Sequence, residues 1–284
     1  MHLLDICDLA APLPLRKQLF SPTGILGLDL LLGGGWLRGR ISEISGKEQS
    51  GKSTLALYAL AQAQRNNRTA VIVTGRGDEV QDWRLNLCHI DLADILVAEA
   101  TEYDEAIEAA CSLLKTHDVD VLVIDDLHRS QVTKGRARLT KPRMGLLAAA
   151  TQQSGTTTLL VVDTSMHWLD ASPFWIGQHI NTKYRGNNLL DVHAVRTPTG
   201  YVGKTLSIPV RDGGGVDDAL HVLRLATRLG IVEDRHGYYT YRGDKLGHGA
   251  AATALQLSLR SDPILLDIDT EIRRLGAEAL FEHA

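Results

Sequence analysis

One eight-residue segment constrains the fold of this chain more than any other feature. Residues 46–53 read Gly-Lys-Glu-Gln-Ser-Gly-Lys-Ser and fit the pattern G-x-x-x-x-G-K-[ST] in full. A short strand is predicted before them at residues 41–44, and a helix after them over residues 54–65. The pattern requires this context, because the backbone N–H groups of a glycine-rich turn and the N-terminus of the next helix together bind phosphate oxygens. A chance match in a glycine-rich turn is the alternative, and the flanking strand and helix disfavour it.

This phosphate loop predicts a site for ATP and Mg²⁺. Lys52 is expected to reach the β- and γ-phosphates, and Ser53 to bind the metal ion. Residues 119–126 read as an apolar strand that ends in carboxylates, and Asp125 is expected to hold the Mg²⁺ shell through water. Asp125 could instead cap the following segment. The predicted nucleotide contacts are Gly46, Lys47, Glu48, Gln49, Ser50, Gly51, Lys52, Ser53 and Thr54.

Short apolar runs of strand length recur along the first two thirds of the chain. They lie at residues 70–74, 119–124 and 158–162, and helical patterns separate them, at residues 79–87 and 102–115 among others. Such a series predicts an α/β fold with a mainly parallel sheet covered on both faces. From about residue 191 shorter β-like runs follow, and then helices at residues 217–229, 250–259 and 267–282. We expect a short lead-in (1–20), a core (21–213) and a small C-terminal α+β domain (214–284).

Composition excludes several classes of protein. The 284 residues are 44% hydrophobic and 23% charged, which is ordinary for a globular protein and unlike a disordered one. No apolar run is long enough to span a membrane. Three scattered cysteines predict neither a disulfide framework nor a zinc site, and favour a reducing, cytoplasmic location. The net charge of −4 excludes a globally basic nucleic-acid binder but leaves room for a local basic surface.

Several segments of the chain resemble the bacterial RecA recombinases. They are residues 22–29, 33–35 and 39–44, the phosphate loop, and residues 119–125, 144–146, 229–232, 239–249 and 252–254. The segment 239–249 looks like the C-terminal domain of bacterial-type RecA, and it is more distinctive than a phosphate loop. The resemblance implies an ATPase that assembles head to tail as a helical filament on single-stranded DNA and promotes homologous pairing and strand exchange. It also implies contacts with double-stranded DNA.

The turn after the second core strand departs from that family. The family has a glutamate there that activates the attacking water, and an ungapped alignment places Arg76 at this position. An arginine stays protonated and cannot act as a base, so Asp78 or Glu79 would have to replace the glutamate, or hydrolysis would be slow. Trp83 stands where the family stacks an aromatic ring on adenine; it reads equally well as a core residue of the helix over residues 79–87.

Two further departures concern nucleotide sensing. After Val162 the family has an Asn-Gln pair that senses the γ-phosphate, and this chain has Asp163-Thr164. Arg196 resembles the first of two lysines that reach the ATP of the neighbouring subunit, but Pro198 stands in place of the second. These differences favour an alternative, a RecA-like paralogue that binds ATP and DNA, or a repair partner, without full recombinase activity. A third reading, a phosphate-loop ATPase unrelated to DNA, is disfavoured by residues 239–249.

Three surfaces are candidates for DNA binding. Residues 130–150 contain no acidic residue and occupy the place of the first DNA-binding loop of the family, and residues 171–190 occupy that of the second. Cations and aromatic rings in these stretches suit phosphates and stacked bases. The alternatives are a solvated loop for the first stretch and, for the second, packing of the aromatic side chains in the core or in a subunit interface. The C-terminal cations are expected to guide duplex DNA, or are plain surface charges. The candidates are Lys134, Arg136, Arg138, Lys141, Arg143, Trp175, Lys183, Arg185, Arg242 and Lys245.

Overall fold

The computed structural model describes residues 19–74, 88–100, 103–125, 141–164, 173–198, 200–211, 215–259 and 263–281. Its main strands are β3 (Ile41–Gly46), β4 (Ala70–Thr74), β5 (Ile95–Glu99), β6 (Val121–Asp125), β7 (Thr157–Asp163), β8 (Ile176–Gly186), β9 (Leu189–Arg196) and β10 (Thr205–Pro209). They form one sheet in the order β10-β9-β8-β3-β7-β6-β4-β5. All neighbouring strands from β8 to β5 in this order are parallel, and β9 and β10 pair antiparallel.

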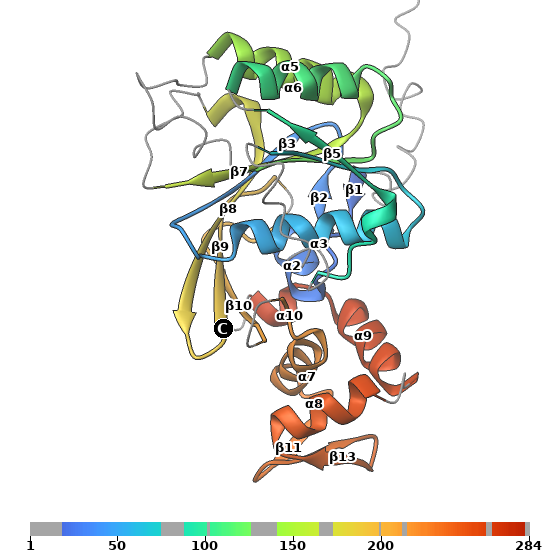
Figure 1. Cartoon of the computed structure of the whole chain (residues 1–284). Coiled ribbons are helices and arrows are strands. Elements are labelled where there is room, and N and C mark those ends of the chain that lie inside the picture. Colours follow the sequence, from blue (N-terminus) through green and yellow to red (C-terminus); the bar gives the residue numbers. More distant parts are fainter. Residues whose placement is uncertain are drawn as a thin grey trace, which may run out of the picture.

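Helices cover both faces of this sheet. α3 (Lys52–Arg65) and the short α2 (Leu26–Leu32) lie on one side, and α5 (Tyr103–Leu114) and α6 (Lys141–Ser154) lie on the other (Figure 1). Strands β4, β6 and β7 are buried at every position, since they pack against helices on both faces. The predicted α/β fold with a mainly parallel sheet is confirmed.

The C-terminal part combines helices with a small antiparallel sheet that lies at the outer end of the molecule (Figure 1). Its strands are β11 (Glu233–Arg235), β12 (Tyr238–Tyr241) and β13 (Asp244–His248), and its helices are α7 (Asp218–Arg228), α8 (Ala250–Leu259), α9 (Pro263–Leu275) and α10 (Glu278–Phe281). Short elements complete the described structure: the strand pair β1 (Phe20–Ser21) and β2 (Trp36–Leu37), and the 3₁₀ turns η3 (Leu92–Asp94) and η5 (Pro173–Trp175).

Two sequence predictions of local structure were wrong. The helix expected over residues 267–282 is two helices, because Gly276 between them has a φ of +78°, outside the helical region. The stretch 171–190, expected as a loop, contains η5 and the eleven residues of β8. The apolar–polar alternation typical of a strand is not visible in this part of the sequence, because polar side chains occupy inward positions of β8. Gln178 is fully buried and accepts hydrogen bonds from the Leu37 amide (2.8 Å) and the Ser42 hydroxyl (3.0 Å).

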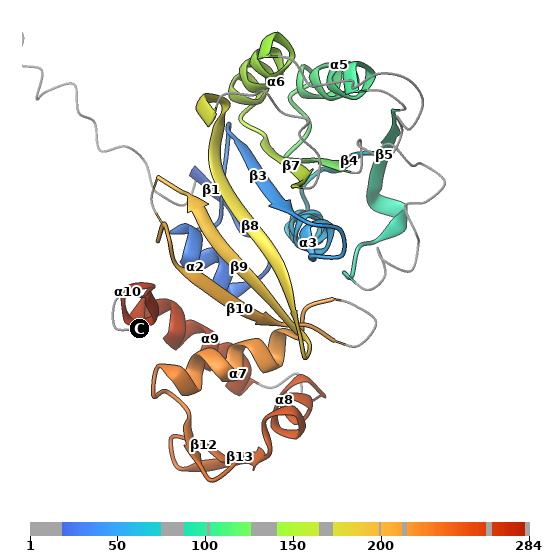
Figure 2. The same ribbon diagram turned by 90° about the vertical axis from the view of Figure 1, so that its left-hand side faces the viewer.

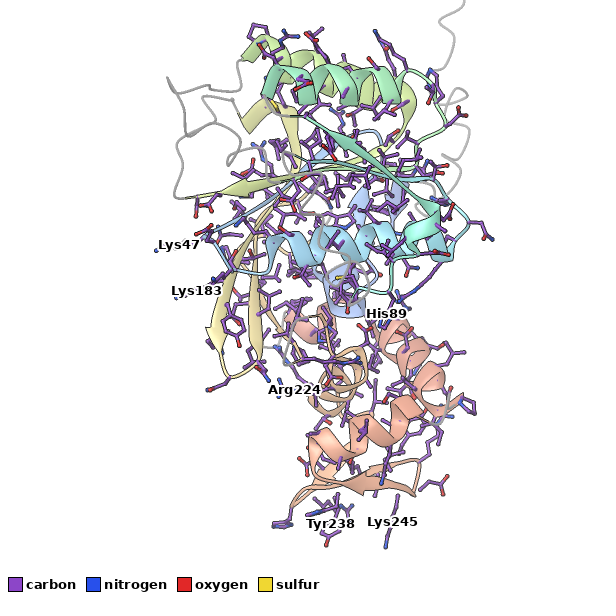
Figure 3. All side chains as sticks on the ribbon, in the orientation of Figure 1. Lys47, His89, Lys183, Arg224, Tyr238 and Lys245 are labelled. Carbon is purple, nitrogen blue, oxygen red and sulfur yellow. The ribbon has the colours of Figure 1, made fainter. Side chains whose placement is uncertain are left out.

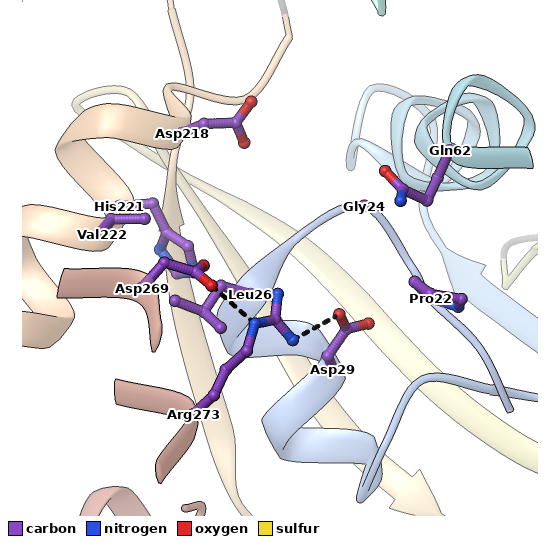
Figure 4. Close-up of a pocket in the computed structure, with 10 residues that line it drawn as sticks. All are labelled: Pro22, Gly24, Leu26, Asp29, Gln62, Asp218, His221, Val222, Asp269 and Arg273. Atoms are coloured by element: carbon purple, nitrogen blue, oxygen red, sulfur yellow. Dashed lines mark hydrogen bonds and ion pairs between the residues drawn. The ribbon is translucent and has the colours of Figure 1, made fainter. Parts of the chain in front are cut away.

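The C-terminal part contacts the core where α7 packs against α2 and β10 (Figure 2). The Gly27 amide donates to Nε2 of the buried His221 (3.2 Å), and a Cβ at Gly27 would lie 2.6 Å from that nitrogen. Arg273 of α9 forms ion pairs with Asp269 (2.7 Å) and with Asp29 of α2 (3.5 Å), beside a cavity of about 290 Å³ (Figure 4). Burial raises the pKa of Asp29 to about 6 and lowers that of His221 to about 4.

No helix in the described part of the chain is long and apolar enough to cross a membrane.

Candidate functional site

The phosphate loop connects the end of β3 to the start of α3. Gly51 lies at the N-cap of α3 in a left-handed conformation (φ +83°), and Gln49 in the loop is also left-handed (φ +58°). Gly51 has no side chain to cap the helix, so the first amides of α3 remain available to an anion. Inside the turn the Ser50 amide donates to the Lys47 carbonyl (3.2 Å). This is the backbone form that the sequence pattern predicts.

Two glycines of the loop have no room for a side chain. A Cβ at Gly46 would lie 2.7 Å from the Thr182 carbonyl oxygen and would also collide with the Ser50 hydroxyl. A Cβ at Gly51 would lie 2.9 Å from the Leu190 side chain. The loop is therefore packed closely against β8 and β9, and it fits a phosphate chain whose oxygens are bound by backbone amides.

Lys52 is the first residue of α3, and its side chain is only 8% exposed. Its Nζ donates to the Lys47 carbonyl (2.8 Å) and forms an ion pair with Asp163 Oδ2 at 3.6 Å. Asp163 ends β7, directly beside Gly46 at the end of β3, and its side chain is 2% exposed. Sequence reasoning treated Asp163 only as a missing sensor amide. The sequence does not predict that Asp163 pairs with Lys52. The signal that could have indicated it is an acidic residue at the carboxyl end of a parallel strand, the end at which ligands bind.

Asp125 ends β6 and lies level with Thr74 of β4 at the same edge of the sheet. It is 9% exposed, and Ser53 is half-buried in the first turn of α3. Within the described residues no three His, Cys, Asp or Glu side chains come together as a metal site. Mg²⁺ bound with a nucleotide needs fewer protein ligands, because phosphates and water supply the others. The hydroxyl of Ser53 and the carboxylate of Asp125 are the donors that such an ion accepts.

Lys183 lies close to the phosphate loop. Its neighbour Thr182 pairs with Gly46 across β8 and β3, and the hydroxyls of Thr182 and Ser50 are 2.9 Å apart. The side chains of Lys47 and Lys183 are exposed on the same side of the molecule (Figure 3). Lys183 is expected from the sequence in a DNA-binding loop, and the structure places it on strand β8, beside the phosphate loop. Its contact with DNA stays a prediction.

Arg196 ends β9, and its Nη1 donates to the Ile176 carbonyl (3.1 Å). It lies level with His179 of β8, which in turn lies level with Glu43 of β3. Glu43 precedes Gly46 by three residues, so Arg196 is set back about 10 Å along the strands from the loop of its own chain.

A polar cluster surrounds His179 on β3 and β8. The His179 Nε2 and Ser45 Oγ atoms are 2.7 Å apart, and Glu43 Oε1 lies 3.4 Å from the same nitrogen. Burial raises the pKa of the Glu43 carboxyl to about 7. Burial, together with the charge of Arg196, lowers the pKa of His179. Burial thus disfavours the charged form of both side chains.

Three of the expected DNA-binding arginines are paired with carboxylates. Arg143 of α6 contacts Glu108 (2.9 Å) and Asp104 (3.2 Å) of α5, and Arg185 contacts Asp191 at 2.7 Å. Arg242 contacts Asp267 (2.6 Å) and Glu271 (3.4 Å). These pairs reduce the positive charge that the three arginines present to a phosphate backbone.

The remaining predicted site residues lie on several different elements or outside the described part of the chain. Lys141 begins α6, and Lys245 is exposed on the small sheet at the far end of the molecule (Figure 3). Trp175 is half-buried and packs near Gly145 of α6, while Phe174 stacks edge-on to it and is 77% exposed. The packing of Trp175 agrees with the core alternative, and Phe174 is the ring that faces solvent. The residues outside the described part of the chain are Arg76, Asp78, Glu79, Trp83, Lys134, Arg136 and Arg138.

Comparison with known proteins identifies one family. The RecA N-terminal domain family matches residues 16–163. A protein named RecA from Syntrophus aciditrophicus is 28% identical over 89% of this chain and 83% of its own length. Proteins of the same name from Nocardia farcinica (27%, over 93% of this chain and 86% of the relative) and Mesomycoplasma hyopneumoniae (23%, over 86% and 82%) are also similar. Because the family match covers more than half of the sequence, this chain belongs to the RecA family.

Proposed function

We propose that this protein is a DNA-dependent ATPase that assembles on single-stranded DNA and promotes homologous pairing and strand exchange in recombination and repair. The observation that carries the proposal is the phosphate loop, with Lys52 buried at its end, in a chain whose similarity to proteins named RecA runs into the C-terminal part. In this proposal the protein acts in the cytoplasm. Its chain consists of a lead-in (1–20), an ATPase core (21–213) and a small C-terminal domain (214–284).

In this proposal ATP lies along the loop from Gly46 to Thr54. The loop amides and the start of α3 bind phosphate oxygens, and Lys52 contacts the β- and γ-phosphates. Ser53 and Asp125 hold Mg²⁺, which neutralises charge on the phosphate oxygens when it is bound. Trp83 contacts adenine, and Asp78 or Glu79 orients water. Arg196, set back from its own loop, reaches the nucleotide of the next subunit in a head-to-tail filament.

DNA contacts follow from the basic stretch that leads into α6. Lys134, Arg136, Arg138 and Lys141 track the phosphates of single-stranded DNA, while Arg242 and Lys245 meet duplex DNA. Arg143, Arg185 and Arg242 are weaker contributors, because carboxylates already pair with them. The exposed ring of Phe174, next to Trp175, offers a stacking surface for a base.

A second candidate function is an accessory RecA paralogue that binds nucleotide and DNA, or a repair partner, without strand exchange. The ion pair between Lys52 and Asp163 favours it, because a buried carboxylate occupies the position of a sensor amide. Arg76, at the position of the family's glutamate, and Pro198, at that of its second lysine, also favour an accessory paralogue.

ATP hydrolysis with and without single-stranded DNA separates the two candidates. If the protein is a recombinase, DNA should stimulate turnover several-fold. The absolute rate is low if neither Asp78 nor Glu79 takes the role of the glutamate that Arg76 replaces. A general base typically contributes roughly 10²–10⁴-fold. Binding of ATP and DNA without turnover would support the accessory paralogue. Hydrolysis that is indifferent to DNA would contradict both.

A further inference from the structure

The ion pair between Lys52 and Asp163 neutralises the central cation of the phosphate loop. The two side chains are 8% and 2% exposed, so solvent screens their attraction weakly. Lys52 donates in addition to the Lys47 carbonyl (2.8 Å), and this bond holds its ammonium group inside the loop. In the structure, the charge that a phosphate would meet at Lys52 is therefore already matched by a carboxylate.

The position of Asp163 decides which phosphate it affects. In a loop of this type the backbone amides hold the α- and β-phosphates, and the lysine reaches the β- and γ-phosphates. Asp163 contacts the tip of the Lys52 side chain and ends β7 next to Gly46, and the Thr164 amide donates to the Gly46 carbonyl (3.0 Å). Its carboxylate thus lies at the Lys52 end of the loop, the end where a γ-phosphate is bound.

We propose that Asp163 sets the nucleotide preference of this loop, by weakening the binding of nucleoside triphosphates relative to diphosphates. The inference rests on the proposed function, because it requires that the loop binds nucleotides. A γ-phosphate must compete with Asp163 for Lys52 and then remain a few ångströms from a buried carboxylate of the same sign. A diphosphate lacks that group and meets less of the repulsion.

This arrangement has a consequence for regulation. The ion pair stabilises the nucleotide-free loop and disfavours the triphosphate-bound one, so the triphosphate state depends on added positive charge. Mg²⁺ supplies part of that charge, and a cation from a neighbouring subunit would supply more. The triphosphate state is then coupled more tightly to assembly than it would be with an amide at residue 163.

The test measures dissociation constants of the full chain for Mg²⁺–AMP-PNP and Mg²⁺–ADP by calorimetry, without DNA. Asp163→Asn keeps the shape of the side chain and removes its charge, and Asp163→Ser is a second variant in case the first folds poorly. Asp120→Asn is the matched control. It removes a carboxylate just before β6, at the end of the parallel strands away from the phosphate loop, where Asp120 pairs with Arg38 at 3.4 Å. Thermal unfolding without nucleotide verifies that each variant is folded.

The expected result is that Asp163→Asn and Asp163→Ser tighten AMP-PNP roughly tenfold or more relative to ADP, while Asp120→Asn leaves the ratio unchanged. An unchanged ratio, or an equal gain for both nucleotides, would overturn the inference. Weaker AMP-PNP binding would overturn it as well and would make Asp163 a metal-shell residue. If neither the wild type nor the variants bind any nucleotide, the proposed function itself fails. If the wild type binds ADP alone and Asp163→Asn binds both, the inference holds in its strongest form.

Discussion

At the scale of single residues, the phosphate loop depends on where one buried ammonium group is held. Lys52 begins a helix, so its backbone lies where the helix dipole favours anions, and its side chain is folded back to the Lys47 carbonyl. Only 8% of that side chain is exposed. The exposed Lys47, five residues earlier, contributes its carbonyl oxygen to this arrangement, while its side chain points to solvent (Figure 3).

Lys52→Ala should weaken nucleotide binding strongly, whereas Lys115→Ala should not. The substitution removes charge-assisted bonds to phosphate, each worth about 1.5–3 kcal/mol, so affinity should fall by roughly 10- to 100-fold or more. Lys115→Ala is the matched control, because it removes an exposed lysine just after α5, on the face of the sheet opposite to α3 (Figure 1). Titration with ADP measures both variants. Equal affinities for Lys52→Ala and the wild type would show that the loop does not bind nucleotide.

A second residue-scale prediction concerns pH and His221. Its pKa of about 4 in the folded chain, against 6.5 in the unfolded chain, means that the unfolded state alone takes up a proton there between those values. The free energy of unfolding therefore falls as pH drops through that window. Between pH 7 and pH 5 this group should cost the wild type about 2 kcal/mol. Asp29 acts in the opposite direction, since its raised pKa favours the folded state on acidification.

His221→Gln isolates that contribution, because a glutamine oxygen can still accept from the Gly27 amide while Asp29 remains in place. Urea unfolding at pH 7 and pH 5 should show about 2 kcal/mol less loss for this variant than for the wild type. His248→Gln, at an exposed histidine, should behave like the wild type. If His221→Gln and the wild type lose the same stability on acidification, His221 takes up its proton equally in both states.

At the scale of elements, strand β8 shows why residues 171–190 do not read as a strand from the sequence. Its inward positions carry Gln178 and Thr182, so the apolar–polar alternation that marks a strand is absent from the sequence. Gln178 is buried because Ser42, Leu37 and Gly35 satisfy its amide, and these partners are about 140 residues earlier in the chain. A contact of that span has no local signal.

The basic stretch before α6 gives a prediction at this scale. Replacing Arg136, Arg138 and Lys141 together with alanine should weaken single-stranded DNA binding for every sequence. The slope of log affinity against log salt should become shallower by roughly 0.7 for each phosphate that the variant no longer neutralises. Arg65→Ala is the control, because it removes an exposed arginine at the C-terminal end of α3, outside the proposed DNA-binding surfaces. Anisotropy of labelled oligonucleotides over a salt series measures both; an unchanged slope in the triple variant would exclude this stretch as a phosphate-binding surface.

At the scale of the whole molecule, the sequence predicted those features whose signals are local. The pattern at residues 46–53 located the loop, and the apolar runs of β4, β6 and β7 indicated a parallel sheet because such strands are buried on both faces. The pairing of Lys52 with Asp163 and the contact of Ser50 with Thr182 join elements more than 100 residues apart. Both contacts depend on the order of the strands in the sheet, which the sequence alone does not predict.

The central claim is that nucleotide bound at this loop controls DNA binding, and anisotropy of a labelled single strand tests it most directly. The wild type should bind the oligonucleotide more tightly with Mg²⁺–AMP-PNP than with Mg²⁺–ADP or without nucleotide. Lys52→Ala should bind with the same low affinity in all three conditions. Wild-type affinity that is identical in the three conditions, or a nucleotide effect that persists in Lys52→Ala, would contradict this claim.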